Sequence, residues 1–260
     1  MHLPFIADIK RNSLDDGPGI RSTVFFKGCP LSCSWCHNPE CIHAGPELLF
    51  RPADCIDCRD CVANCPNGAI GPTGPGSLDR SRCHRSGRCA DECPTGALEL
   101  VGRRYDLDEL LALLLRDQAF YRNSGGGVTL SGGEATLFGD YAGALARRLR
   151  EAGAHVLLET CGHFEWRRFA TQLLPYLDTI YFDLKLADPS AHERWCGRDN
   201  GLILENLDRL LEDREEQRLE VLVRVPLVPN VTCTEANLTA IATLLRGRGA
   251  QRVALLPYNP

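Results

Sequence analysis

The chain has 260 residues, with 29 Lys plus Arg against 34 Asp plus Glu, and 14 cysteines. Its length allows one large domain with a small insertion, and its 44% apolar and 24% charged residues exclude a disordered or fibrous protein. The longest apolar run, residues 110–115, is too short to span a membrane, and the net charge of -5 disfavours nucleic acid, so we expect neither as a partner.

Cysteine usage is the unusual feature of the composition. Residues 1–11 lack the apolar core of a signal peptide, so we expect a cytoplasmic protein, in which thiols are kept reduced. Eleven of the 14 cysteines lie between Cys29 and Cys93. Clustered cysteines in a reducing compartment indicate metal binding or redox catalysis rather than disulfides.

Short β-rich apolar runs alternate with segments that have apolar residues at helical spacing. The predicted strands are residues 22–27, 128–131, 155–160, 179–184, 219–228 and 252–257. The predicted helices are residues 107–114, 137–149, 164–177, 204–211 and 238–245. This alternation predicts an α/β fold with a parallel sheet, as a barrel or partial barrel of six β/α units.

A small module interrupts this pattern. Residues 51–98 are rich in Cys, Gly, Pro, Asp and Arg and have almost no apolar periodicity. Such a segment is held together by something other than a hydrophobic core. We therefore expect residues 1–50 and 99–260 to form the barrel and residues 51–98 to form an insert.

The first cysteine cluster follows the first predicted strand and has the spacing C-x3-C-x2-C, in Cys29, Cys33 and Cys36. Three thiolates would leave the fourth iron of a cubane open to a substrate's donor atoms, as in a catalytic cluster. The alternative is a zinc site, which needs a fourth ligand such as His37 or Cys41. Trp35, directly before the last cysteine, and the glycine-rich end of the second predicted strand favour the cluster.

Two cysteine runs repeat one another in the predicted insert. The first run, C-x2-C-x2-C-x3-C-P, is that of bacterial ferredoxins and comprises Cys55, Cys58, Cys61 and Cys65. The second run comprises Cys83, Cys89 and Cys93. In two-cluster modules the last cysteine of each run binds the other cluster, so we expect Cys93 with the first run and Cys65 with the second. A zinc knuckle, the alternative, would pair C-x2-C units across a longer spacer.

Ser86 stands in the second run where the pattern has a cysteine. The fourth ligand of the second cluster is then the Ser86 oxygen, His84, the spare Cys41 or no residue at all. We expect a labile or oxygen-ligated second cluster.

The segment from Asp16 to Glu40, DGPGIRSTVFFKGCPLSCSWCHNPE, resembles the signature of radical S-adenosylmethionine enzymes. It is most similar to the glycyl-radical enzyme activating enzymes related to pyruvate formate-lyase activating enzyme, and the resemblance covers nearly the whole chain. It implies a partial (β/α)6 barrel, a catalytic 4Fe-4S cluster with S-adenosylmethionine on its open iron, and two clusters in the ferredoxin-like insert. The cofactor would yield a 5'-deoxyadenosyl radical that takes a hydrogen from a backbone glycine of a large partner enzyme. Flavodoxin or ferredoxin would donate the electron, and the protein would be a monomer.

The resemblance also assigns residues to the cofactor. Gly132, Gly133 and Glu134, in VTLSGGEA, resemble the motif for the methionine amino group, although a GGE triplet alone is more often a turn into a helix. Further strand-end residues would form the polar site near the methionine carboxylate, with room for a monovalent cation, or else an ordinary ion pair. The residues that the resemblance implies there and in the cluster loop are Trp35, Cys36, His37, Glu159, Thr160, Asp183, Leu184 and Lys185.

Four other positions carry separate expectations. Arg224, in the apolar fifth strand, needs a partner if it faces the barrel interior and is solvated if it faces outward. Asn259 stands where relatives carry a His against the adenosyl group, and it can hydrogen-bond but not ionise. The chain stops at Pro260, where relatives continue, so we expect a truncated chain. Asp16 resembles the residue near which relatives receive the glycine-bearing loop, and DGPG is also a turn sequence.

Three cysteines are isolated from the clusters in the sequence, and we expect them to be buried, inert thiols, namely Cys161, Cys196 and Cys233.

Two rival functions remain at this level. One is another radical S-adenosylmethionine enzyme that modifies proteins, against which the DGPG segment and the position of the insert argue. The other is an iron-sulfur electron carrier without catalysis, which would release no 5'-deoxyadenosine.

Overall fold

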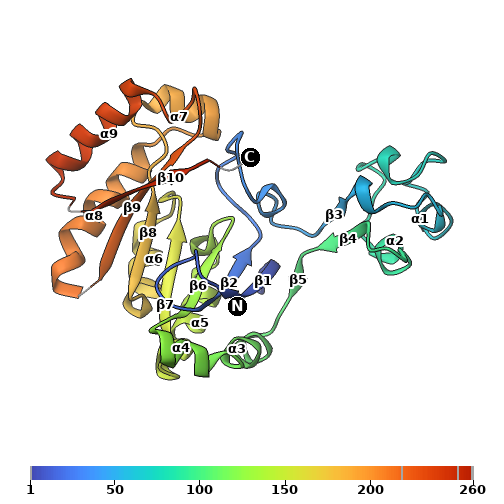
Figure 1. Cartoon of the computed structure of the whole chain (residues 1–260), viewed down its shortest axis with the longest axis horizontal. Helices are drawn as coiled ribbons and strands as arrows, with labels where there is room; N and C mark the ends of the chain where they lie inside the picture. Colours follow the sequence, from blue (N-terminus) through green and yellow to red (C-terminus); the bar gives the residue numbers. More distant parts are fainter. Residues whose placement is uncertain (1, 218, 251, 259–260) are drawn as a thin grey trace. The chain divides into compact units, whose positions relative to one another are not determined.

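The computed structural model describes residues 2–217, 219–250 and 252–258 (Figure 1). The chain divides into two compact units. Unit 1 comprises the residues up to Ala44 and from Arg104 onward, and unit 2 comprises Gly45–Arg103. In the part of the chain that the structure describes, no helix has both the length and the apolar character needed to cross a membrane.

Unit 1 is built on an eight-stranded sheet with the order β10-β9-β8-β7-β6-β2-β1-β5. The strands β2 and β6 to β10 pair in parallel, and β1 is antiparallel to β2. The strand bounds are β1 Phe5–Ser13, β2 Arg21–Phe26, β5 Arg103–Arg104, β6 Gly127–Gly132, β7 His155–Thr160, β8 Thr179–Asp183, β9 Glu220–Leu227 and β10 Val253–Pro257. The predicted α/β class with a mostly parallel sheet is confirmed, and Figure 1 shows β6 to β10 as neighbouring arrows.

Helices connect these strands. Their bounds are α3 Leu107–Leu115, α4 Gln118–Ser124, α5 Gly139–Glu151, α6 Trp166–Gln172, α7 Pro189–Cys196, α8 Gly201–Gln217 and α9 Glu235–Gly247, with short 3-10 helices η1 Pro39–Cys41, η4 Ala135–Phe138 and η5 Leu174–Tyr176. Asp188 begins α7, because its carboxylate accepts a hydrogen bond from the Ala191 backbone N–H at 2.7 Å. The helix predicted over 164–177 divides into α6 and η5, since Pro175 has no N–H to continue an α-helix.

The core of unit 1 lies on both faces of the parallel strands. One residue from each of five neighbouring strands is completely buried, namely Val24, Leu130, Leu158, Ile180 and Val225. Parallel strands covered by helices on both faces have this continuous burial. The sheet therefore gives its carboxyl edge a rigid support, where the loops after the strands begin.

Unit 2 has little regular structure. Its elements are β3 Glu47–Phe50, η2 Pro52–Asp54, α1 Asp60–Ala63, η3 Pro75–Ser77, α2 Arg88–Asp91 and β4 Leu98–Val101. The strands β3 and β4 pair antiparallel, from Glu47 opposite Val101 to Phe50 opposite Leu98, and extend the unit beyond residues 51–98 at both ends. Its core contains five buried side chains, Leu48, Cys61, Ile70, Cys89 and Leu98. A core of this size stabilises a fold weakly unless a disulfide or a metal supports it.

Candidate functional site

Loops after the parallel strands surround an open cavity of about 300 Å³ in unit 1. The three cysteines of the first cluster line it. The other predicted site residues that line it are Asp16, Trp35, His37, Gly132, Gly133, Glu159, Thr160, Asp183, Lys185 and Arg224. Glu134 and Leu184 are buried and are not part of the lining, and Asn259 lies outside the described residues.

The loop that carries the three cysteines is held against the end of α7. Ser32 and Ser34 donate backbone hydrogen bonds to the carbonyls of Cys196 and Trp195, at 2.9 and 3.0 Å. Gly197 follows the helix with a φ of +82°, and a Cβ there would lie 2.3 Å from Ser32 Oγ. Glycine adopts this φ without strain, and a Cβ at this position would also force the Ser32 hydroxyl to move. The sequence analysis predicts neither α7 nor this support.

Two cysteines that are distant in the sequence lie against the loop of Cys29, Cys33 and Cys36, which we call the cluster loop. Hydrogen bonds join the thiol of Cys29 to that of Cys161 and the thiol of Cys33 to that of Cys196. The bond with Cys196 lowers the pKa of Cys33 to about 7, although burial opposes this shift. The prediction of buried thiols is confirmed for Cys161 and Cys196 and is wrong for Cys233, which is exposed.

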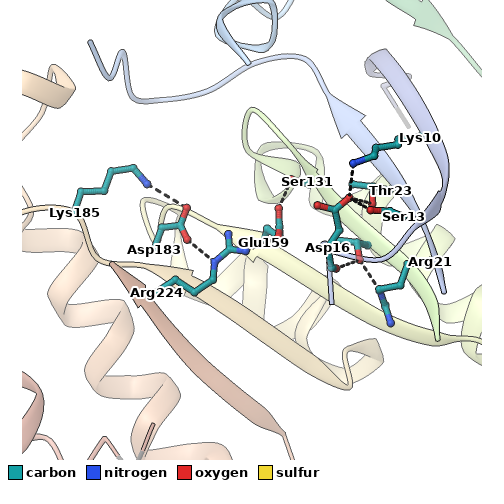
Figure 2. Close-up of polar contacts among 11 residues, drawn as sticks. Lys10, Ser13, Asp16, Arg21, Thr23, Ser131, Glu159, Asp183, Lys185 and Arg224 are labelled. Carbon is teal, nitrogen blue, oxygen red and sulfur yellow. Dashed lines mark hydrogen bonds and ion pairs between the residues drawn. The ribbon is translucent and has the colours of Figure 1, made fainter. Parts of the chain in front are cut away.

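Charged side chains from three neighbouring strands meet at the floor of the cavity (Figure 2). Arg224 Nε donates to Asp183 Oδ1 at 2.8 Å, and Arg224 Nη1 donates to Glu159 Oε1 at 2.5 Å. Lys185 Nζ lies 3.3 Å from Asp183 Oδ2, and Ser131 Oγ donates to Glu159 Oε2 at 2.5 Å. Arg224 thus faces the interior with two partners, which decides between the two orientations that the sequence left open.

This chain of charges is balanced and largely withdrawn from water. Burial would raise the pKa of Asp183, but Arg224 and Lys185 outweigh it and lower that pKa. At Glu159 burial dominates and raises the pKa, although Arg224 opposes it. The arrangement provides fixed positive and negative groups for a zwitterionic ligand, since charge-assisted hydrogen bonds are the stronger kind.

The glycines after β6 bring its end close to β2. A Cβ on Gly133 would lie 2.2 Å from the Gly28 carbonyl oxygen, so no larger residue fits. The Glu134 backbone N–H donates to the same carbonyl at 2.7 Å. Its carboxylate accepts from the Thr160 hydroxyl and from the Cys161 backbone N–H at 2.8 Å. Glu134 thereby joins the ends of β2, β6 and β7.

Asp16 lies in the turn between β1 and β2 and also lines the cavity. Its carboxylate accepts hydrogen bonds from Ser13 Oγ at 2.5 Å and from Thr23 Oγ1 at 2.8 Å, and Lys10 Nζ lies 3.8 Å away (Figure 2). Its backbone carbonyl accepts from Thr129 Oγ1 at 2.8 Å. Asp16 therefore belongs to a turn and also lines the cavity.

The sequence analysis missed one aromatic contact. The rings of His37 and Tyr258 stack with their centroids 5.3 Å apart, and both residues line the cavity. The sequence signal for this contact was Tyr258 in the stretch LLPYN, where the expectation concerned only Asn259.

Unit 2 contains two small cavities. The first, of about 20 Å³, is lined by Cys55, Cys58, Cys61 and Cys93, and we call it the four-cysteine cavity. The second, of about 10 Å³, is the three-cysteine cavity and is lined by Cys65, Cys83 and Cys89 together with His84 and Ser86. Each cavity thus contains the last cysteine of the other run. Among the residues that the structure describes, no three His, Cys, Asp or Glu side chains are placed to hold a single metal ion.

Backbone amides surround Cys65 and Cys93, the last cysteines of the two runs. The Ala69 N–H donates to Cys65 Sγ at 3.1 Å. Burial alone would raise the pKa of Cys65 and that of Cys93. Hydrogen bonds from backbone amides outweigh this effect and lower both pKa values. Amides that stabilise thiolates in a cavity lined by cysteines are suited to an iron-sulfur cluster.

Comparisons with known proteins agree with this geometry. Residues 54–97 match the family model of the 4Fe-4S dicluster domain. The chain is 38% identical to the isethionate sulfite-lyase activating enzyme of Desulfovibrio desulfuricans, over 98% of this chain and 82% of that protein. It is 39% identical to the benzylsuccinate synthase activating enzyme of Thauera aromatica, over 94% of this chain and 75% of that protein. The chain belongs to the glycyl-radical enzyme activating enzymes.

The fold of this activating enzyme also has a solved counterpart. A radical SAM methyltransferase from Sphaerobacter thermophilus aligns with 99% of this chain and 68% of its own, with a TM-score of 0.53 and 17% identity. That likeness concerns the fold alone. Within the family, an iron-sulfur cluster and S-adenosylmethionine together supply a 5'-deoxyadenosyl radical. This radical takes a hydrogen from a glycine of a glycyl-radical enzyme.

Proposed function

We propose that the cavity of unit 1 binds the catalytic 4Fe-4S cluster and S-adenosylmethionine together. Cys29, Cys33 and Cys36 would hold three irons, and the fourth iron would remain free for the cofactor. The observation that carries this proposal is that three thiols line the same cavity as the Glu159–Arg224–Asp183 chain of charges. The amino and carboxylate groups of the cofactor need partners of both signs, which this floor provides.

The residues around this floor would have distinct roles. The backbone at Gly132 and Gly133 would receive the methionine amino group, while Glu134 would position that backbone through its bonds to β7. Thr160 and the two carboxylates could add oxygen ligands for a monovalent cation. Buried Leu184 would hold Asp183 and Lys185 in place. The aromatic faces of Trp35, His37 and Tyr258 offer a surface for the adenosyl group.

We also propose that β2 and β6 to β10 form a partial (β/α)6 barrel and that residues 51–98 form an electron-transfer module with two clusters. The chain would then hold three clusters. A flavodoxin or ferredoxin would supply the electron, and the enzyme would act as a monomer. Asp16 would lie where the glycine loop of the partner enters, because it lines the cavity beside the cysteine loop.

Cofactor cleavage tests the first proposal. The protein, loaded with iron and sulfide without oxygen, is expected to release 5'-deoxyadenosine from S-adenosylmethionine under dithionite. Cys33→Ala should abolish the release, and Lys185→Met should raise the KM for the cofactor. Arg252→Ala, which alters an exposed ion pair with Glu220, is the matched control and should change neither value. Release by Cys33→Ala at the rate of the unaltered enzyme would refute the proposed ligand set.

Activation of a partner enzyme tests the proposed role of Asp16. The protein is incubated with a panel of purified glycyl-radical enzymes, including the kinds named for its relatives, and the glycyl radical is measured by EPR. We expect Asp16→Asn to lower the radical yield on the partner while cleavage of S-adenosylmethionine alone continues. An equal loss of both reactions would place Asp16 with the cofactor rather than with the partner.

A further inference from the structure

We propose that the three-cysteine cavity binds a 4Fe-4S cluster in which the iron facing Ser86 has no thiolate ligand, so that mild oxidation releases this iron. The cluster in the four-cysteine cavity stays intact under the same conditions. The inference rests on the proposed cluster binding of unit 2 and is independent of the chemistry in unit 1.

The backbone around Ser86 repeats that around Cys58. The residues that flank Cys58 have φ values of +55° and +64°, and those that flank Ser86 have +54° and +82°. A four-residue helix follows in each case, α1 and α2. Three of these four flanking residues are not glycine, and the left-handed region is unfavourable for them. The second run therefore keeps the strained loop of a cluster ligand although the sulfur is replaced by oxygen.

The two cavities match position by position. Cys55, Cys61 and Cys93 line one cavity, and Cys83, Cys89 and Cys65 line the other from equivalent places in the repeat. Cys61 and Cys89 are both buried within four-residue helices. The remaining pair is Cys58 and Ser86, both exposed. One substitution thus separates a complete thiolate set from an incomplete one.

The other candidate ligands do not occupy the fourth position. His84 follows Cys83 directly and so corresponds to Ile56, which lines the four-cysteine cavity without a donor atom. Cys41 belongs to the other unit and is completely buried within it. Ser86 is therefore the only residue at the position of the missing thiolate within the described lining.

A serine hydroxyl binds cluster iron weakly, because iron-sulfur clusters select soft thiolate ligands. Oxidation would convert the 4Fe-4S cluster in its 2+ state into a 3Fe-4S cluster in its 1+ state, one Fe2+ ion and one electron. Ferricyanide takes the electron and becomes ferrocyanide. The three thiolates keep their bonds to iron, and the Ser86 hydroxyl keeps its proton.

The experiment uses the full chain with C29A, C33A and C36A, because the catalytic cluster has its own open iron. This parent is loaded without oxygen, and iron content and low-temperature EPR are measured before and after ferricyanide. We expect the iron content to fall from about eight to about seven per chain, with about one 3Fe-4S spin. Adding Ser86→Cys should keep all the iron and remove the signal, whereas Cys58→Ser should double it, and His84→Ala should leave it unchanged.

Several results would overturn the proposal. They are a parent that keeps its iron without a 3Fe-4S signal, a parent that loads only about four irons, a signal that survives Ser86→Cys, or one that depends on His84. If Ser86→Cys loads less iron than the parent and so has not folded, Cys58→Ser decides, since an unchanged signal there refutes the equivalence of the two sites. Because this parent has no catalytic cluster, none of these results depends on cleavage of S-adenosylmethionine.

Discussion

Unit 1 and unit 2 stabilise their sites by opposite means. Unit 1 has completely buried aliphatic residues on five neighbouring strands, and its cavity lies at the carboxyl ends of that sheet. Unit 2 has a hydrophobic cluster of five buried residues, of which two are the cysteines Cys61 and Cys89. A large core can place a site in advance, whereas a small core depends on the group that it binds.

Removing the iron is expected to have the largest effect and to separate the two units. Chelation of the loaded protein should unfold unit 2, because metal binding and folding are one process in such modules. Amide exchange in Gly45–Arg103 should then become fast, while β6, β7 and β8 stay protected. Equal protection of unit 2 with and without iron would show that its small core suffices.

Arg224→Ala is expected to be the next largest change, because it leaves two carboxylates at the cavity floor without their common partner. Breaking a buried ion pair costs about 3–5 kcal/mol of unfolding free energy. Arg224 is only 12% exposed, whereas Arg252, in the control Arg252→Ala, is 72% exposed and should cost less than about 1 kcal/mol. Urea unfolding of both variants measures the difference, and similar losses would mean that the floor is solvated.

A pair of glycine substitutions compares the packing of the units. In α5 of unit 1, a Cβ on Gly143 would lie 1.9 Å from the Gln172 carbonyl oxygen, so Gly143→Ala should cost about 1–3 kcal/mol. In unit 2, nothing lies within 4 Å of a Cβ on Gly76, so Gly76→Ala should change stability by less than about 0.5 kcal/mol. Thermal unfolding of the loaded protein checks both values, and a harmless Gly143→Ala would show that α5 can move.

The smallest expected effect is a pH dependence of unit 1 at His155. Burial, and next the charge of Arg21, lower the pKa of His155 below 6.5, so the folded state holds this ring neutral. The unfolded chain binds the proton first, and stability should therefore fall as the pH drops below about 6.5. Between pH 7.5 and 5.5, the free energy of unfolding measured with urea should fall more steeply in the unaltered protein than in His155→Gln. The same pH dependence in both proteins would show that His155 is not the cause.

The sequence allowed prediction of the elements with a strong local pattern. The six parallel strands are short β-rich apolar runs, and each lies within one residue of its predicted ends. Strand β1 has no such run, because only Ile6 and Ser13 of its nine residues are buried. Helix α7 buries only His192 and Cys196, which is too few for a visible period.

Contacts between distant segments explain the rest of the difference at the site. The sequence indicated that Arg224 needs a partner if it faces inward but could not give its direction, which depends on the register of β8 and β9. It also gave no sign that Cys161 and Cys196 lie beside the cluster loop. The grouping of cysteines in unit 2 was accessible because the two runs repeat each other within one short segment.

The charged residues at the cavity floor also report on the alignment of the sheet. Asp183 lies opposite Arg224, and Glu159 lies opposite Tyr181 on the intervening strand. A slip of β9 by a single residue would turn the guanidinium to the reverse side and leave both acids stranded. If the cofactor binds at this floor as proposed, a misaligned sheet would lose these ion pairs and the binding site together, so correct sheet assembly and competence for catalysis would arise in the same event.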